Sequence, residues 1–169
     1  DLSRRGMYRP IGINRNNFVA ITQLRPYMPH DLQGVEWIAV GSNTFNEAVP
    51  FYAHINATPA YLANTTGDVT TESFYWANRI VAAMADAHYP ACLAHVERYQ
   101  LALSTAGHAM LKRFDEQYLA APEKDGAAYL TACNQQLADK ARKLTDDLLS
   151  KVLFSASMEM KNGFARSDS

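Results

Sequence analysis

The chain has 169 residues, of which 48% are hydrophobic and 20% are charged, and its formal net charge is -1 at pH 7. This length and composition are typical of one globular domain and are far from those of an intrinsically disordered chain. A net charge near zero gives no electrostatic reason to expect nucleic acid or an anionic membrane as a partner. No apolar run approaches the ~20 residues that span a bilayer, so we expect no membrane-embedded segment.

The first residues of the chain are rich in arginine. Every lysine comes at Lys112 or later, and Asp1 is the only acid before His30. Arginine without lysine favours planar recognition of carboxylates or carbonyl groups. A basic strand edge that resists aggregation explains the pattern equally well. The arginines are Arg4, Arg5, Arg9, Arg15 and Arg25.

Residues 1–70 have the two-residue period of β-strands. The stretch "NFVAITQLR" (17–25) alternates between two faces and ends where Pro26 and Pro29 cannot donate to a ladder. The stretch "GVEWIAVG" (34–41) predicts a second strand that is apolar on both faces and therefore covered on both. The stretch "AVPFYAHI" (48–55) predicts a third, weaker strand, because it contains a proline. Residues 56–71 are expected to form a long loop.

From residue 71 the apolar residues recur at helical spacing. Thr70 or Thr71 is expected to cap a first helix, Pro90 to lie in the first turn of a second, and Pro122 to open a third. The third helix has an apolar stripe along its length. The stripe consists of Leu130, Leu137, Ala141, Leu144, Leu148 and Val152.

These patterns predict an α+β fold. Antiparallel strands in residues 1–70 precede three long helices in residues 71–162, and residues 163–169 form a frayed tail after Gly163. Three strands with helices on one side leave an apolar face or an unpaired edge. We therefore expect residues 1–169 to be one domain that forms part of a larger one, and we expect the isolated chain to associate.

Local motifs by themselves do not predict an enzyme. The histidines show no metal-ligand spacing, so we expect no metal and no cofactor. The serine-hydrolase elbow, the phosphate loop and the dinucleotide fingerprint are all missing from the sequence. Cys92 and Cys133 lack the basic surroundings that lower a thiol pKa, so both are predicted to be buried and unreactive.

Four phrases occur in order at close spacing. They are "YRPI" at Tyr8–Ile11, "ITQLRP" at Ile21–Pro26, "GVEWIAVGSNTFNEAVPFY" at Gly34–Tyr52 and "SFYWANRIVAAMAD" at Ser73–Asp86. Together they resemble the C-terminal half of the cysteine dipeptidases of the N-terminal-nucleophile hydrolase superfamily. Those enzymes are distantly similar to penicillin V acylase and bile-salt hydrolase. The resemblance extends from about Arg4 to Asp115.

The resemblance implies an αββα sandwich, in which a cysteine at the mature N-terminus attacks the peptide carbonyl. Its own α-amino group serves as the base, because an α-amine titrates near ~8. Residue 1 of this chain is aspartate, so the nucleophile would lie in an N-terminal half outside the chain. The expected partners are that half and dipeptide substrates. We also expect a homo-oligomer, located in the cytoplasm, and no activity from this chain alone.

The resemblance also suggests site residues. Arg9 best matches an arginine that related amidases place near the nucleophile, where it would stabilise the thiolate or orient a substrate carboxylate. An arginine that merely bridges a strand and a loop is the alternative. Arg25, Trp37 and Tyr52 are candidates for lining the substrate pocket, or else belong to the core or its rim.

Two other functions are compatible with the sequence. A self-sufficient helical interaction module would present Leu137, Leu144 and Leu148 to a partner. A non-peptidase amidase of the same superfamily would act on an acyl-amino compound.

Overall fold

The computed structural model describes residues 16–160 of the chain. Three strands, β1 (Phe18–Leu24), β2 (Gly34–Val40) and β3 (Val49–Tyr52), form an antiparallel sheet in the order β1-β2-β3. All three strands predicted from the alternating pattern are therefore confirmed. Pro50 is tolerated within β3 because the backbone N–H and carbonyl groups that point toward β2 belong to residues 49, 51 and 53. The hydrogen bond from the Ala53 N–H to the Gly34 carbonyl sets this alternation. The nitrogen of Pro50 consequently points to the outer edge.

The helical half consists of α2 (Phe74–Ala87), α3 (Tyr89–Ala120) and α4 (Gly126–Met158). Three long helices were predicted and are present. Two short elements were not predicted: the 3₁₀ turn η2 (His30–Leu32) and α1 (Ala60–Ala63), which lies inside the expected loop.

The helix starts require two corrections. Ser73, and not Thr70 or Thr71, caps α2, because its hydroxyl accepts a hydrogen bond from the Trp76 N–H. Pro122 does not open α4, which begins at Gly126 after an Asp125 cap. In both cases a side chain nearer to the helix satisfies a free N–H group. The predicted position of Pro90 in the first turn of α3 is confirmed. The predicted stop at Gly163 lies outside the described residues.

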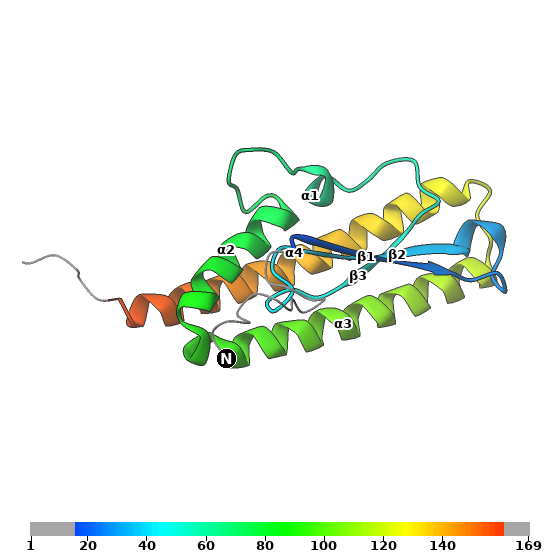
Figure 1. Ribbon diagram of the computed structural model, residues 1–169. Helices are drawn as coiled ribbons and strands as arrows, with labels where there is room; N and C mark the ends of the chain where they lie inside the picture. Colours follow the sequence, from blue (N-terminus) through cyan, green and yellow to red (C-terminus); the bar gives the residue numbers. More distant parts are fainter. Residues whose placement is uncertain (1–15, 161–169) are drawn as a thin grey trace, which may run out of the picture.

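The long helices α3 and α4 run antiparallel and side by side, and α3 lies along one face of the sheet (Figure 1). Val35, Trp37 and Ala39 of β2 point to this face, as do Pro50 and Tyr52 of β3. Gly107 permits the close approach of α3, because a Cβ at this position would lie 2.7 Å from Cδ of Pro50. The hydrophobic core packs between this face and the helices, and it also includes Val40, Val49 and Phe51 of the opposite face.

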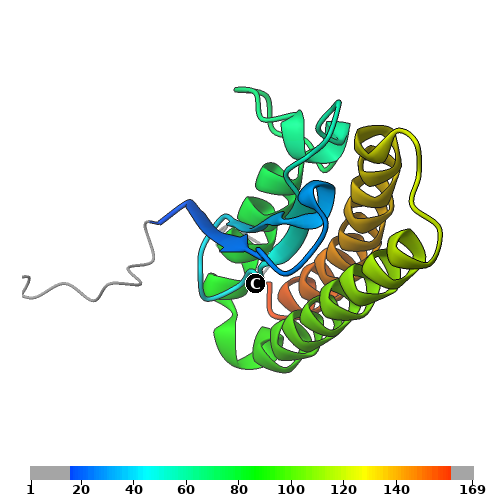
Figure 2. The same cartoon turned by 90° about the vertical axis from the view of Figure 1, so that its right-hand side faces the viewer.

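The opposite face of the sheet is covered only in part. Val40, next to α2, is buried, and so are Val49 and Phe51 of β3, but Ile38 and Glu36 are partly exposed. The prediction that β2 is covered on both faces is therefore wrong at Glu36 and Ile38, whose side chains remain partly exposed on this face. β1 is more exposed still, because it lies on the side of the sheet away from α3 and α4 (Figure 2).

A side chain of α4 closes the β3 edge of the sheet. The Asn134 amide accepts a hydrogen bond from the Tyr52 N–H and donates one to the Tyr52 carbonyl, each at 2.9 Å. Asn134 is fully buried, so no water replaces these bonds. The amide occupies the place that a neighbouring strand would take in a wider sheet.

We predict that Asn134→Ala lowers the free energy of unfolding of this chain by about 2 to 4 kcal/mol, because two buried backbone groups lose their partners. Urea unfolding followed by circular dichroism measures this change. The control is Gln135→Ala, which removes an exposed side chain bound to Asp139 and should cost less than about 0.5 kcal/mol. Equal losses in the two variants would contradict the role given to Asn134.

Candidate functional site

Arg25 lies at the centre of a buried polar network. It follows β1 directly, and its Nη1 and Nη2 donate to the two carboxylate oxygens of Asp115 on α3 at 2.6 and 3.2 Å. Nε and Nη2 also donate to the carbonyl oxygen of Leu32, at 3.1 and 2.5 Å. Arg25 is only 4% exposed, so its planar donors are occupied by partners within this chain.

Tyr52 completes the same network. Its hydroxyl donates to Asp115 Oδ1 at 2.9 Å, and its ring centroid lies 5.8 Å from Cζ of Arg25. Burial raises the pKa of Tyr52, and the negative charge of Asp115 raises this pKa further. The tyrosine is therefore neutral and acts as a hydrogen-bond donor. Arg25, Asp115 and Tyr52 together join the end of β1, the end of β3 and the C-terminal part of α3.

Trp37 points to the same face of the sheet but lies at its rim. Its Nε1 donates to Gln23 Oε1 at 3.0 Å, and its ring centroid lies 4.6 Å from that of His108 on α3. Trp37 is half-buried and His108 is exposed. Among the sequence-predicted site residues that the structure describes, Trp37 is the one with substantial exposed surface.

The structure thus brings two of the four predicted residues together. Arg25 and Tyr52 are in contact inside the chain, Trp37 is on the rim, and Arg9 lies outside the described residues. A role in substrate binding stays a prediction for all four. What the described residues establish is that Arg25 and Tyr52 hold other groups of the chain in place.

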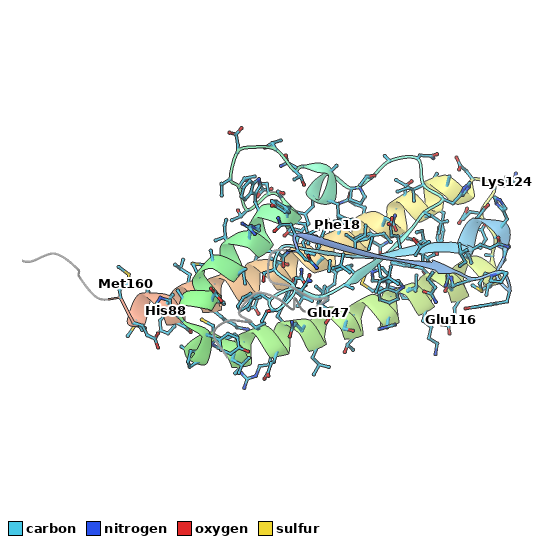
Figure 3. The ribbon with its side chains drawn as sticks, in the orientation of Figure 1. Phe18, Glu47, His88, Glu116, Lys124 and Met160 are labelled. Atoms are coloured by element: carbon cyan, nitrogen blue, oxygen red, sulfur yellow. The ribbon has the colours of Figure 1, made fainter. Side chains whose placement is uncertain are left out.

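The partly covered face of the sheet carries an apolar groove. Its volume is about 380 Å³, and none of its lining residues is charged. A second hollow of about 290 Å³ shares Ile38, Thr58 and Leu62 with it, so the two form one trough along the sheet. Phe18, labelled in Figure 3, lies at one end. The groove itself offers no acid or base, and the second hollow adds one carboxylate, that of Glu36. The groove is lined by Asn17, Phe18, Ile38, Val40, Thr58, Leu62, Thr65, Phe74 and Tyr75.

Neither cysteine has the properties of a nucleophile. Cys92 and Cys133 are free, buried and part of α3 and α4, as predicted. Burial raises the pKa of both thiols, so they stay protonated at neutral pH. Within residues 16–160, His, Cys, Asp and Glu side chains form no group of three or more that could hold a metal ion.

A second polar cluster was not predicted from the sequence. Asp31 of η2 accepts a hydrogen bond from the Tyr118 hydroxyl at 2.7 Å. Its other oxygen lies 3.4 Å from Nδ1 of His30 and 3.6 Å from Nε2 of His54. The Tyr118 hydroxyl lowers the pKa of Asp31 most, and His30 lowers it further. The cluster joins η2 to the last turn of α3, so it supports the loop that also supplies the Leu32 carbonyl.

Of the partners that sequence reasoning missed, two interrupt an apolar stripe. Asp115 lies one turn after Leu111 on α3, and Asn134 stands between Leu130 and Leu137 on α4. A polar residue at a core-facing helical position predicts that it has a hydrogen-bonding partner in the core. The pattern does not identify that partner.

Comparison with known proteins decides the family. The model of peptidase family C69 matches residues 1–102. The chain belongs to this family. The resemblance to cysteine dipeptidases that the four phrases carry is confirmed. Across residues 16–160 no helix combines the length and apolar character needed to cross a membrane.

Similar sequences extend along nearly the whole chain. A protein named dipeptidase from Bifidobacterium longum is 40% identical over 99% of this chain and 39% of its own length. A probable dipeptidase A from Streptococcus pyogenes is 41% identical over 96% of the chain and 34% of its own length. A probable dipeptidase B from Lactococcus lactis is 37% identical over 97% of the chain and 34% of its own length. The chain therefore spans between a third and two fifths of these relatives.

We predict that Asp115→Asn lowers the free energy of unfolding by about 3 kcal/mol, because it leaves the buried guanidinium of Arg25 without its counter-charge. Urea unfolding at neutral pH measures the loss. The control is Glu116→Gln, which changes the adjacent, exposed carboxylate and should cost less than about 0.5 kcal/mol. An Asp115→Asn variant as stable as the parent chain would rule out a structural role for the ion pair.

The lowered pKa of Asp31 predicts a pH-dependent contribution to stability. Because the folded-state pKa lies below the unfolded value of about 4, the contribution is complete well above that value and is lost as the pH falls through the folded pKa. Tyr118→Phe should therefore be less stable than the parent at about pH 6, and the difference should shrink on acidification. Urea unfolding over this pH range tests it, with Tyr27→Phe, an exposed tyrosine, as control. A difference independent of pH would exclude this linkage.

Proposed function

We propose that this chain is the C-terminal part of a dipeptidase of broad specificity that hydrolyses small peptides. The supporting observation is identity near 40%, along almost the whole chain, to proteins named dipeptidase or probable dipeptidase. In this proposal a cysteine at the N-terminus of the mature polypeptide attacks the peptide carbonyl, and its α-amino group takes the thiol proton. That cysteine belongs to the part of the protein outside this chain.

The properties of the described cysteines support a nucleophile located elsewhere. Cys92 and Cys133 are buried in helices with raised pKa values, so neither is a thiolate that a substrate could reach. The chain by itself is then inactive, and it contributes strands and a helical layer to the catalytic domain. Residues 1–169 would form one unit within that domain.

We also propose that the complete fold is an αββα sandwich. The helices α3 and α4 supply one outer layer, and the three strands supply part of one sheet. The partly exposed face with its apolar trough suits contact with a second sheet, because sheets in a sandwich pack through their apolar faces.

The predicted site residues take two kinds of role in this proposal. Arg9 stabilises the thiolate or orients the substrate carboxylate through its planar donors. Arg25 and Tyr52 would act as positioning residues, because their network attaches the end of β1 to α3. Trp37 would line the rim of the substrate pocket.

Two further properties are proposed for the whole protein. We place it in the cytoplasm, because both described cysteines are free thiols, which a reducing compartment preserves. We expect a homo-oligomer, because large apolar side chains are exposed near the end of α4. They are Leu153, Phe154, Met158 and Met160.

The other candidate functions are less well supported. Leu137 and Leu148 are buried in the core of this chain and Leu144 packs against it, so these residues are not free to bind a partner as an interaction module requires. For a non-peptidase amidase we find no specific observation, since the relatives reported above carry the name dipeptidase.

The test is the activity of the complete polypeptide toward dipeptides and toward acyl-amino compounds. We predict hydrolysis of dipeptides, and a loss in kcat/KM of about 100-fold on Arg9→Ala, as for removal of one charge-stabilising donor. Arg98→Ala, on the exposed side of α3, is the control and should leave kcat/KM unchanged.

The outcomes separate the two parts of the proposal. Unchanged kcat/KM in the Arg9→Ala variant would remove Arg9 from the mechanism. Hydrolysis of acyl-amino compounds without hydrolysis of dipeptides would replace the dipeptidase by an amidase.

A further inference from the structure

The two edges of the sheet differ in their capacity to accept another strand. At the β3 edge Pro50 has no N–H to donate, and the N–H and carbonyl of Tyr52 are both bound to the Asn134 side chain. A strand arriving at this edge would have to displace a buried amide from α4. The β3 edge is therefore closed.

The β1 edge is open among the described residues. The bonds from the Gly41 N–H to the Asn17 carbonyl and from the Arg25 N–H to the Gln33 carbonyl set the phase of the ladder. The odd-numbered residues of β1 accordingly direct their N–H and carbonyl groups toward β2, and the even-numbered residues direct theirs outward, away from the sheet. The even-numbered residues are Phe18, Ala20, Thr22 and Leu24. Within residues 16–160 no strand pairs with them.

β1 also lacks the features that protect a genuine edge strand. Its sequence, FVAITQL, contains no charge and no proline, and no bulge interrupts its register with β2. Phe18 and Leu24 are 60% and 76% exposed. Natural edge strands avoid this combination, because it favours pairing with any other chain.

We propose that β1 is an interior strand of the complete sheet. Its outer edge binds an extended segment of the complete polypeptide that is not part of residues 1–169, with apolar side chains beside Phe18 and Leu24. β3 is then the terminal strand, and Asn134 prevents the sheet from growing past it. This inference rests on the proposed function only in assuming the longer protein.

The lengths of the relatives support a segment of the same polypeptide as the occupant. More than half of each relative lies outside the matched region, so ample chain exists to supply strands. A tethered segment also has a high effective concentration at the edge, which a second copy of this chain lacks. The apolar trough next to Phe18 continues the same surface, so one added strand would also extend the wall of the trough.

Hydrogen exchange of individual amides, measured by NMR, tests the proposal in the complete polypeptide and in this chain. In this chain at low concentration, the amides of Val19, Ile21 and Gln23 should be protected and those of Ala20, Thr22 and Leu24 should exchange freely. In the complete polypeptide both sets should be protected, the second set by about 100-fold or more relative to this chain. The odd-numbered amides are thus an internal control.

Each outcome decides one point. Free exchange of the even-numbered amides in the complete polypeptide would overturn the proposal. Protection that disappears on dilution to the monomer would assign the edge to a second copy instead, and would also overturn it. If the amides are protected but dipeptides are not cleaved, the pairing stands and the proposed function fails.

A pair of proline variants provides a second test. Thr22→Pro removes an outward N–H and should lower the thermal midpoint of the complete polypeptide by several degrees while leaving that of this chain nearly unchanged. Gln23→Pro removes an inward N–H and should lower both midpoints. Equal effects of Thr22→Pro on the two polypeptides would contradict an occupied β1 edge.

Discussion

The buried ion pair between Arg25 and Asp115 is the interaction on which the rest of the structure depends. Removing two charges from water costs several kcal/mol per ion, so such a pair is stable only when its other hydrogen-bonding groups are also satisfied. Here the Leu32 carbonyl and the Tyr52 hydroxyl complete it. Because Arg25 directly follows β1 and Asp115 lies on α3, the pair attaches the end of β1 to the helical layer.

The two edges of the described sheet differ from each other. On the side of β3, the Asn134 amide and a proline end the sheet, and α4 covers it. On the side of β1, backbone groups and apolar side chains face outward, and the mainly apolar trough follows the same surface. The asymmetry agrees with a chain that spans between a third and two fifths of its relatives. The two described cysteines are buried thiols with raised pKa values, so the described residues contain no reactive thiol.

The candidate site shows where sequence reasoning stops. Arg25 and Tyr52 were predicted as site residues from the sequence. Their common partner Asp115, which is 90 residues from Arg25, was not predicted. For Arg25, the planar recognition of a carboxylate and a carbonyl that the arginine pattern predicts does occur, with groups of the chain itself. The other four arginines of the pattern lie outside the described residues. Asp115 and Asn134 were detectable only as polar residues within apolar stripes, which indicates burial without naming a partner.

The sequence by itself determined the strands, the long helices and the family. These follow from periods of two and 3.6 residues and from short ordered phrases, all of which are local. Only the tertiary structure decided that Ser73 and Asp125 cap the helices, that half of one face of β2 is open, and that Asn134 closes one edge. The physical reason is that a periodic pattern reports which side of an element is apolar, whereas the partner of a buried polar group is chosen by contacts between distant segments.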